Sequence, residues 1–244
     1  MSEQVPVTRT VITLRDYARA VLLKWGGGLR PSKATVAVLW AQYCIETGGT
    51  ACWNFNVGNV KSHAGDGYDF HCLRGVWEGV SPAEAERLIA SGEARRDPSA
   101  DHAKAVDPKA EGKRVSVVFE PPHPQTRFRA FYSLEEAMGD HLALLQKRFA
   151  GAWGAVLAGD YKLFAQQLKA RGYFTASAEA YANGMRRAYE DFLMSAGYED
   201  ALEVLAQADA TPTLPALPSE EETGSGGIVH AMPDTVGPAQ DRDE

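Results

Sequence analysis

The chain has few cysteines, no long apolar run and no excess of basic residues. Three cysteines among 244 residues are too few, and odd in number, for a disulfide framework, although a Cys52–Cys72 pair stays open. No apolar stretch reaches the roughly 18–20 residues of a membrane span. The first residues lack the basic and apolar regions of a secretory signal. The formal charge of −7 comes from the end of the chain, and nothing in the rest suggests a nucleic-acid footprint.

Metal and thiol chemistry also lack their usual patterns. The six histidines are scattered, and no CxxC or HExxH spacing occurs, so we expect no metal site and no cofactor. Cys44 and Cys72 have no histidine and asparagine in the order that a thiol peptidase needs. These classes are set aside.

Acidic residues gather at the end of the chain. Residues 209–244 hold eight acids and one arginine, with several prolines and a Gly-Ser-Gly-Gly run. This composition predicts a disordered tail. Residues 1–208 are then formally neutral, and the chain's hydrophobic content of 45% suits one globular domain with a sizeable core.

Helical patterns occupy both ends of that domain. After an arm at 1–11, we expect a helix over 14–24 that stops at three glycines, and a second from Ser32 as N-cap to Gly48. A capping box at 133–136 opens another helical region, in which three apolar stripes along 134–149, 161–168 and 181–193 read as core. A short helix over 199–208 closes the domain at 208.

The middle of the chain reads as a small β-lobe inserted into this helical body. Residues 50–131 are rich in glycine, proline and aromatics. Strand-like runs cover 68–80 and 114–119, and a capping box at 81–84 predicts a short helix to about Gly92. The polar stretch 93–113 reads as a flexible loop. The predicted fold class is therefore mainly α, with a β-lobe at about 50–131.

Glu46 is the first candidate for chemistry. It ends an apolar helical run directly before Thr-Gly-Gly, where the partial negative charge of a helix C-terminus opposes a carboxylate. Its neighbours Cys44, Ile45 and Trp53 are apolar. Burial and the helix end would both raise its pKa, which suits a general acid near neutral pH.

Three segments, in order, resemble the glucosaminidase family of peptidoglycan hydrolases, which has a lysozyme-like helical fold and includes flagellar, autolysin and phage-tail enzymes. Residues 41–61 resemble its catalytic-helix motif and asparagine-rich turn. Residues 128–136 resemble the motif that opens the helix after the lobe. Residues 164–183 resemble its tyrosine motif, although Ala176 stands where the family usually has aspartate. The resemblance implies hydrolysis of a β-1,4 bond of peptidoglycan on the reducing side of N-acetylglucosamine.

The resemblance also assigns roles to residues. Glu46 would be the general acid and Tyr173 the tyrosine that faces the cleaved bond. Glu78 would be the second carboxylate, with Glu120, Asp66 and Asp69 in reserve, unless the substrate's N-acetyl group assists instead. Residues expected to line the cleft or to pack beside it are Trp53, Asn54, Asn56, Asn59, Lys61, Trp77, Phe131 and Tyr181, and packing is the favoured role for Tyr181.

Several alternatives stay open. Muramidase and lytic transglycosylase activities occur on similar folds, because a fold does not fix its chemistry. A wall-binding or structural subunit of a phage tail or contractile injection apparatus is the alternative from another class. Without a signal, the protein would reach the wall by a virion, an injection device, a holin or a secretion route, and the acidic tail is a candidate docking segment.

Overall fold

The computed structural model describes residues 2–26, 28–49, 51–99, 102, 114–174 and 176–210. Residues up to Asp209 form one compact unit. The described helices are α1 (Leu14–Lys24), α2 (Lys33–Thr47), α3 (Pro82–Ala90), α5 (Leu134–Arg148), α6 (Ala150–Ala158), α7 (Tyr161–Ala170), α8 (Ala178–Met194) and α9 (Gly197–Ala210). The strands are β1 (Arg9–Val11), β2 (Ala51–Trp53), β3 (Phe70–Cys72), β4 (Val76–Val80), β5 (Arg95–Arg96), β6 (Val115–Phe119) and β7 (Arg127–Arg129).

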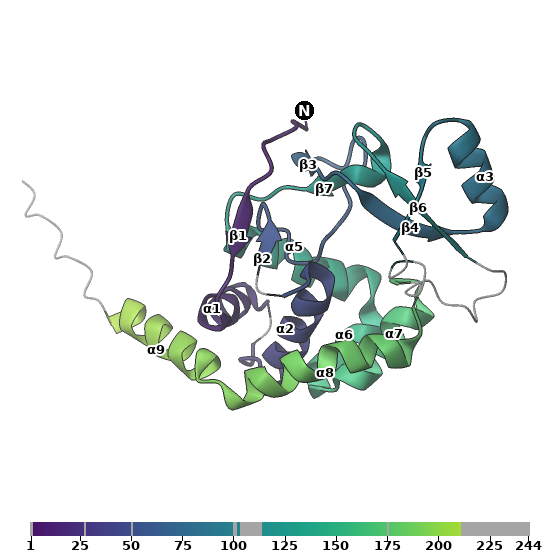
Figure 1. Cartoon of the computed structure of the whole chain (residues 1–244). Coiled ribbons are helices and arrows are strands. Elements are labelled where there is room, and N and C mark those ends of the chain that lie inside the picture. Colours follow the sequence, from purple (N-terminus) through teal and green to yellow (C-terminus); the bar gives the residue numbers. More distant parts are fainter. Residues whose placement is uncertain are drawn as a thin grey trace, which may run out of the picture. The chain divides into compact units, whose positions relative to one another are not determined.

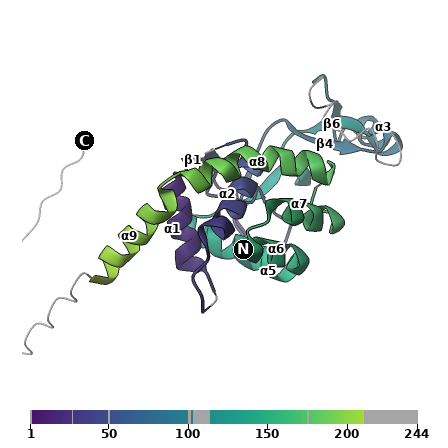
Figure 2. The same cartoon turned by 90° about the horizontal axis from the view of Figure 1, so that it is seen from below.

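The predicted mainly helical fold with a β-lobe is confirmed. Figure 1 shows α3 and the strands β4, β5 and β6 set to one side of the helices within this unit. The helical body is built around α2, whose residues from Thr35 to Tyr43 are all buried. Figure 2 shows α8 lying across α2, and the two helices are in extensive contact. No helix in the described ranges is long and apolar enough to cross a membrane.

Capping side chains place the helix starts where the sequence predicts them. Thr13, Ser32, Ser81 and Ser133 each accept a hydrogen bond from the backbone N–H three residues later. Such a bond satisfies one of the N–H groups that a helix start leaves without a partner. The helix α2 ends at Gly48, which adopts the left-handed conformation (φ 71°) that glycine tolerates best.

The described residues of the β-lobe form three small antiparallel sheets. β1 pairs with β2, β3 pairs with β7, and β6 lies between β4 and β5. The single strand expected over 68–80 is wrong, because the chain turns at Gly75 (φ 67°) between β3 and β4. A separate apolar cluster of Ala85, Leu88, Val117 and Phe119 lies under α3.

Three expected boundaries need correction. The arm at 1–11 is part of the lobe, because Arg9–Val11 pair with β2 and Val5 donates its N–H to the Phe70 carbonyl at 2.8 Å. The stretch read as a flexible loop contains β5, which pairs with β6; its residues 100, 101 and 103–113 lie outside the described part. The helix α9 continues two residues beyond 208, and the predicted tail beyond Ala210 also lies outside the described part.

Candidate active site

Glu46 lies in the last turn of α2, where the helix leaves the core. The residues before it are buried against α8 and the other helices, whereas residues 44–47 are only partly covered. The helix stops two residues later at Gly48. The carboxyl group therefore projects from the end of a buried helix into the space between the body and the β-lobe.

The environment of Glu46 favours its protonated form. Burial raises the pKa of this carboxyl group to about 7, and a hydrogen bond from Tyr181 partly opposes the rise. The Tyr181 hydroxyl donates to Oε1 of Glu46 at 2.5 Å. The ring of Tyr181 lies flat on the ring of Phe174, with centroids 3.9 Å apart and planes 3° apart. The acid thus has a raised pKa and a fixed orientation, which are what a proton donor at neutral pH needs.

Both tyrosines of the predicted motif lie near Glu46. Tyr173 donates its hydroxyl to the Gly58 carbonyl at 3.4 Å and meets Phe149 edge to face. Burial, followed by the nearby Glu46, raises the pKa of Tyr173 well above its ordinary value. Packing was the favoured role for Tyr181, yet it is Tyr181 that contacts the Glu46 carboxyl group. Sequence spacing alone does not distinguish them, since both lie within one short motif.

Glu78 lies on β4 at the opposite side of the same cleft, directly across the strand pair from Val117. Its side chain is 41% exposed and its Oε1 is 3.3 Å from Nζ of Lys61. Burial lowers the pKa of the Lys61 ammonium, and Glu78 partly opposes this. Lys61 also donates to the Gln125 carbonyl at 2.5 Å. The ion pair is therefore held in place on the lobe wall.

The reserve carboxylates are engaged elsewhere. Glu120 pairs with Arg95 at 3.4 Å. Asp69 accepts from the Tyr132 hydroxyl at 2.5 Å. Asp66 accepts from the backbone of the 63–68 turn. They are not among the described residues that line the cleft.

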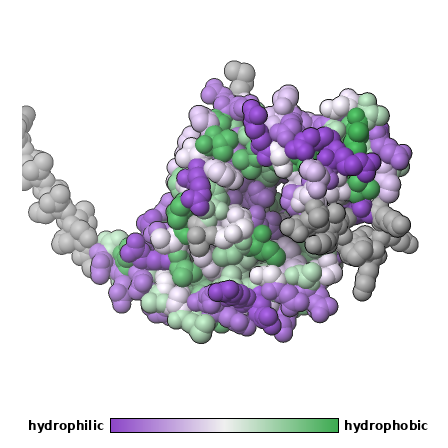
Figure 3. Space-filling view, in the orientation of Figure 1, coloured by the Kyte–Doolittle hydropathy of each residue, from purple (hydrophilic) through white to green (hydrophobic). Residues whose placement is uncertain are grey.

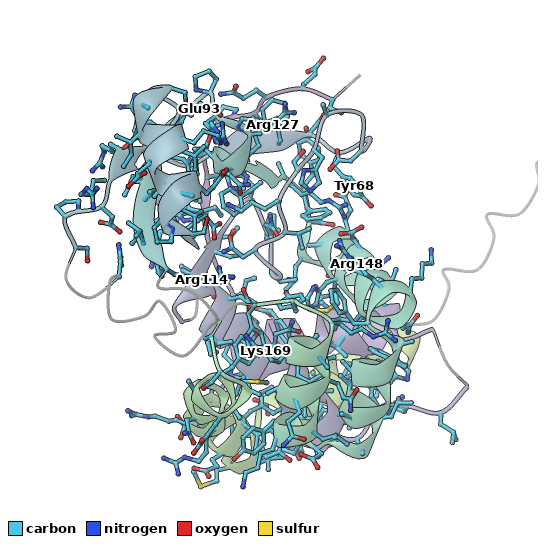
Figure 4. The ribbon with its side chains drawn as sticks, turned by 90° about the vertical axis from the view of Figure 1, so that its right-hand side faces the viewer. Tyr68, Glu93, Arg114, Arg127, Arg148 and Lys169 are labelled. Atoms are coloured by element: carbon cyan, nitrogen blue, oxygen red, sulfur yellow. The ribbon has the colours of Figure 1, made fainter. Side chains whose placement is uncertain are left out.

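A cleft of about 840 Å³ separates the two glutamates. Figure 3 shows the surface hollowed between the lobe and the helical body. Figure 4 looks at this region from the side, with Glu93 on the lobe and Arg148 on the helical body. Of the predicted site residues, those that line this cleft are Glu46, Asn59, Lys61, Glu78 and Tyr173.

Two of the predicted cleft asparagines hydrogen-bond to the backbone. The amide of Asn54 accepts from the Thr8 N–H at 3.0 Å and donates to the Pro6 carbonyl at 2.9 Å. The amide of Asn56 donates to two carbonyls and accepts from the Val60 N–H. Asn54 and Asn59 also have positive φ angles of 48° and 49°, which asparagine tolerates better than most residues. The hydrogen bonds and φ angles of the turn account for asparagine at these positions. Of the three, only Asn59 lines the main cleft.

The two tryptophans differ in position. Trp53 is 40% exposed and lines a smaller adjoining hollow of about 150 Å³ with Asn56, Asn59 and Glu46. Trp77 instead stacks on His102, with centroids 4.3 Å apart. Trp77, Asn54 and Tyr181 are not among the described residues lining either hollow. The buried Phe131 belongs to the main core.

Sequence reasoning missed the far wall of the cleft. Residues at the ends of α5 and α7 reach it, among them Arg148, Phe149, Arg171 and Phe174. Arg171 and Phe174 lie within the tyrosine motif at 164–183, and Phe149 ends the apolar stripe at 134–149. Neither pattern says which helix ends face the lobe. The three cysteines are free. The described ranges hold no group of three or more His, Cys, Asp or Glu that could bind a metal ion.

Neither protein-family models nor curated proteins match this chain. A comparison with solved structures finds the C-terminally truncated glycoside hydrolase domain of Salmonella typhimurium FlgJ, at 19% identity and a TM-score of 0.38, covering 74% of this chain and 95% of that one. It also finds a mutant of the peptidoglycan hydrolase from Sphingomonas sp. A1, at 20% identity and a TM-score of 0.38, covering 82% of this chain and 99% of that one. Because these sequence identities and TM-scores are low, the function has to be argued from the site itself.

Proposed function

We propose that this protein hydrolyses a β-1,4 glycosidic bond of peptidoglycan, with Glu46 as general acid. The observation that carries the proposal is the position of Glu46: a carboxyl group with a pKa raised to about 7, on the wall of a cleft and oriented by Tyr181. A protonated carboxyl group in a cleft is what protonation of a glycosidic oxygen requires.

The proposed hydrolysis begins with proton donation by Glu46. Glu46 gives its proton to the glycosidic oxygen as the bond from that oxygen to the anomeric carbon breaks, and the leaving sugar departs as an alcohol. Water adds to the oxocarbenium-like carbon and loses a proton. The hydrogen bond from Tyr181 stabilises the Glu46 carboxylate that remains, since a bond to an ionised acceptor is stronger than one to a neutral group.

Glu78 is the proposed acceptor of the proton from water. It faces the same cleft from the other lobe, and its ion pair with Lys61 fixes its position. Assistance by the N-acetyl group of the substrate is the competing route. Glu78→Gln distinguishes them: loss of kcat of about 100-fold or more supports a base role, whereas a wild-type rate assigns this step to the substrate.

The bond on the reducing side of N-acetylglucosamine is the proposed target, as the family resemblance implies. The products identify the bond. Purified peptidoglycan is incubated with the protein, reduced with borohydride and analysed by mass spectrometry. Reduced N-acetylglucosamine ends support an endo-β-N-acetylglucosaminidase, reduced muramic acid ends a muramidase, and anhydro ends a transglycosylase.

Two variants make this assay decisive. Glu46→Gln is expected to abolish new ends, because glutamine keeps the shape and carries no transferable proton. Glu179→Gln, at an exposed position in the first turn of α8, is the matched control and should keep wild-type activity. Cleavage retained by Glu46→Gln would refute the assignment. No new ends on several wall types would favour the wall-binding or structural subunit.

Peptidoglycan lies outside the cytoplasm, so the proposal includes delivery by a virion, an injection device, a holin or a secretion route. Immunoblots of purified particles and of culture fractions test this part.

A further inference from the structure

An ion pair lies where the chain passes from the β-lobe to the helical body. The strand β7 ends at Arg129, and the helix α5 begins at Leu134. Across this connection, Nη1 of Arg129 donates to both carboxylate oxygens of Asp140 in α5, at 2.9 and 3.2 Å. Among the ion pairs of the described residues, this one alone joins the lobe to a helix of the body.

Further side chains of the lobe enclose this ion pair. The Arg129 guanidinium lies over the Tyr68 ring, 3.8 Å from its centroid, which is a favourable contact between a cation and an aromatic face. The Tyr68 hydroxyl donates to the same Asp140 carboxylate, and Figure 4 shows Tyr68 where the lobe approaches the helical body. Nε of Arg129 lies 3.6 Å from Asp66. The three charged side chains are only 13–16% exposed, so water and salt screen them less than an exposed pair.

The backbone of β7 is in turn bonded to the segment that carries Lys61. Arg129 donates its N–H to the Val60 carbonyl, and Ser62 donates its N–H to the Arg127 carbonyl, each at 3.0 Å. Lys61 lies between these two hydrogen bonds and forms an antiparallel bridge to β7. A shift of β7 would therefore move Lys61 with it.

Lys61 connects this segment to the candidate base. Its Nζ lies 3.3 Å from Oε1 of Glu78 and donates to the Gln125 carbonyl at 2.5 Å. Arg129, Lys61 and Glu78 all line the cleft that Glu46 lines from the body. A continuous series of contacts thus leads from α5 of the body to Glu78 of the lobe.

We propose that Arg129 and Asp140 are positioning residues, whose ion pair sets the distance between Glu78 on the lobe and Glu46 on the body. Asp140 has a fixed place relative to Glu46, because the buried faces of α5 and α2 pack in the same main core. The separation of two carboxyl groups decides whether a water molecule fits between them and the bond to be cleaved. The importance of the ion pair for catalysis rests on the proposed function, whereas its effect on the orientation of the lobe does not.

Three substitutions test the ion pair. Arg129→Gln and Asp140→Asn each remove one charge and keep a polar side chain. Since the two residues act as one pair, the double variant should shift the lobe no further than either single variant. Glu135→Gln is the matched control, because Glu135 lies in the first turn of the same helix and pairs with Arg19 of α1 at 2.5 Å, within the body.

The first readout is the orientation of the lobe relative to the body, measured in the full chain by backbone ¹⁵N–¹H residual dipolar couplings. In the wild type and in Glu135→Gln, one alignment tensor should fit α2, α5 and α8 together with β4 and β6. In Arg129→Gln and Asp140→Asn, each part should still fit a tensor of its own, but the two tensors should differ. A common tensor in both variants, or the same change in Glu135→Gln, would overturn the proposal. If the neutral variants do not fold, Arg129→Lys provides the same test, because it keeps the charge and loses the planar guanidinium.

This measurement needs no catalysis, so it stands whatever the muropeptide assay shows. If the protein cleaves peptidoglycan, Arg129→Gln and Asp140→Asn should lower kcat by about 10–100-fold, with a smaller change in KM, while Glu135→Gln stays near wild type. In a Glu78→Gln background, Asp140→Asn should cause little further loss. A loss confined to KM, or an equally large further loss in that background, would refute the positioning of Glu78.

Discussion

Glu46→Gln should make the protein more stable at alkaline pH, although it removes the proposed general acid. Burial raises the pKa of Glu46 from 4.5 to about 7, a difference worth about 3 kcal/mol between the two protonation states. Because the side chain faces a cleft that water can enter, we take about 2–3 kcal/mol as the effective value. Glutamine carries no such penalty.

The sign follows from proton binding. Below pH 4.5 the carboxyl group is protonated in the folded and unfolded states alike, and the wild type and the variant should differ little. Between pH 4.5 and about 7 the folded state binds the extra proton, so wild-type stability falls as pH rises. Above about pH 7 the folded protein holds a buried charge and the full penalty applies.

The assay is thermal unfolding of both proteins from about pH 4 to 9 in the same buffers, with urea unfolding at about pH 5 and pH 8 as a second measure. For a domain of this size, about 2–3 kcal/mol corresponds to roughly 5–10 °C in Tm. Glu46→Gln should match the wild type at the acidic end of this range and exceed it by that amount at the alkaline end. A difference that stays constant across pH, or a less stable variant at alkaline pH, would refute the raised pKa.

Further predictions concern the surroundings of the site. Gly58→Ala should lower the free energy of unfolding by about 1–3 kcal/mol, because its Cβ would meet His141 at 2.5 Å; denaturant titration checks this. Removing residues 2–8 should destabilise the lobe by a similar amount, since it leaves the buried Asn54 amide without the Pro6 and Thr8 backbone groups; the effect would show as increased hydrogen exchange in β2, and unchanged exchange would contradict it. Removing 211–244 should leave cleavage of purified peptidoglycan unchanged, and a large loss would mean that the domain boundary is wrong.

Much of the helical body was predictable from local signals. The start of α2 follows from the Ser32 cap and the ends of α1 and α2 from the glycines after each helix, and the stripe on α5 is buried as its spacing indicates. Capping and periodicity act within a few residues, so a single sequence displays them. The position of Glu46 at a helix end could be predicted for the same reason.

The lobe and the finer parts of the site were less predictable, because they depend on contacts between distant segments. β1 meets β2 far along the chain, with Thr10 opposite Cys52, and short strands in separate sheets have no periodicity long enough to detect. Which of Tyr173 and Tyr181 contacts the Glu46 carboxyl group depends on how α8 crosses α2.

The two glutamates belong to differently packed parts of the molecule. Glu46 extends from the main core, whereas Glu78 lies on a sheet that has its own apolar cluster with α3. The distance between the two carboxyl groups therefore depends on how the main core and the α3 cluster pack against each other. Neither core fixes that distance alone. Substitutions where the two cores meet can alter the distance between the carboxylates while both cores stay intact. If the proposed hydrolysis holds, the carboxylate spacing that decides between one hydrolytic route and another can thus drift over evolutionary time without loss of the fold.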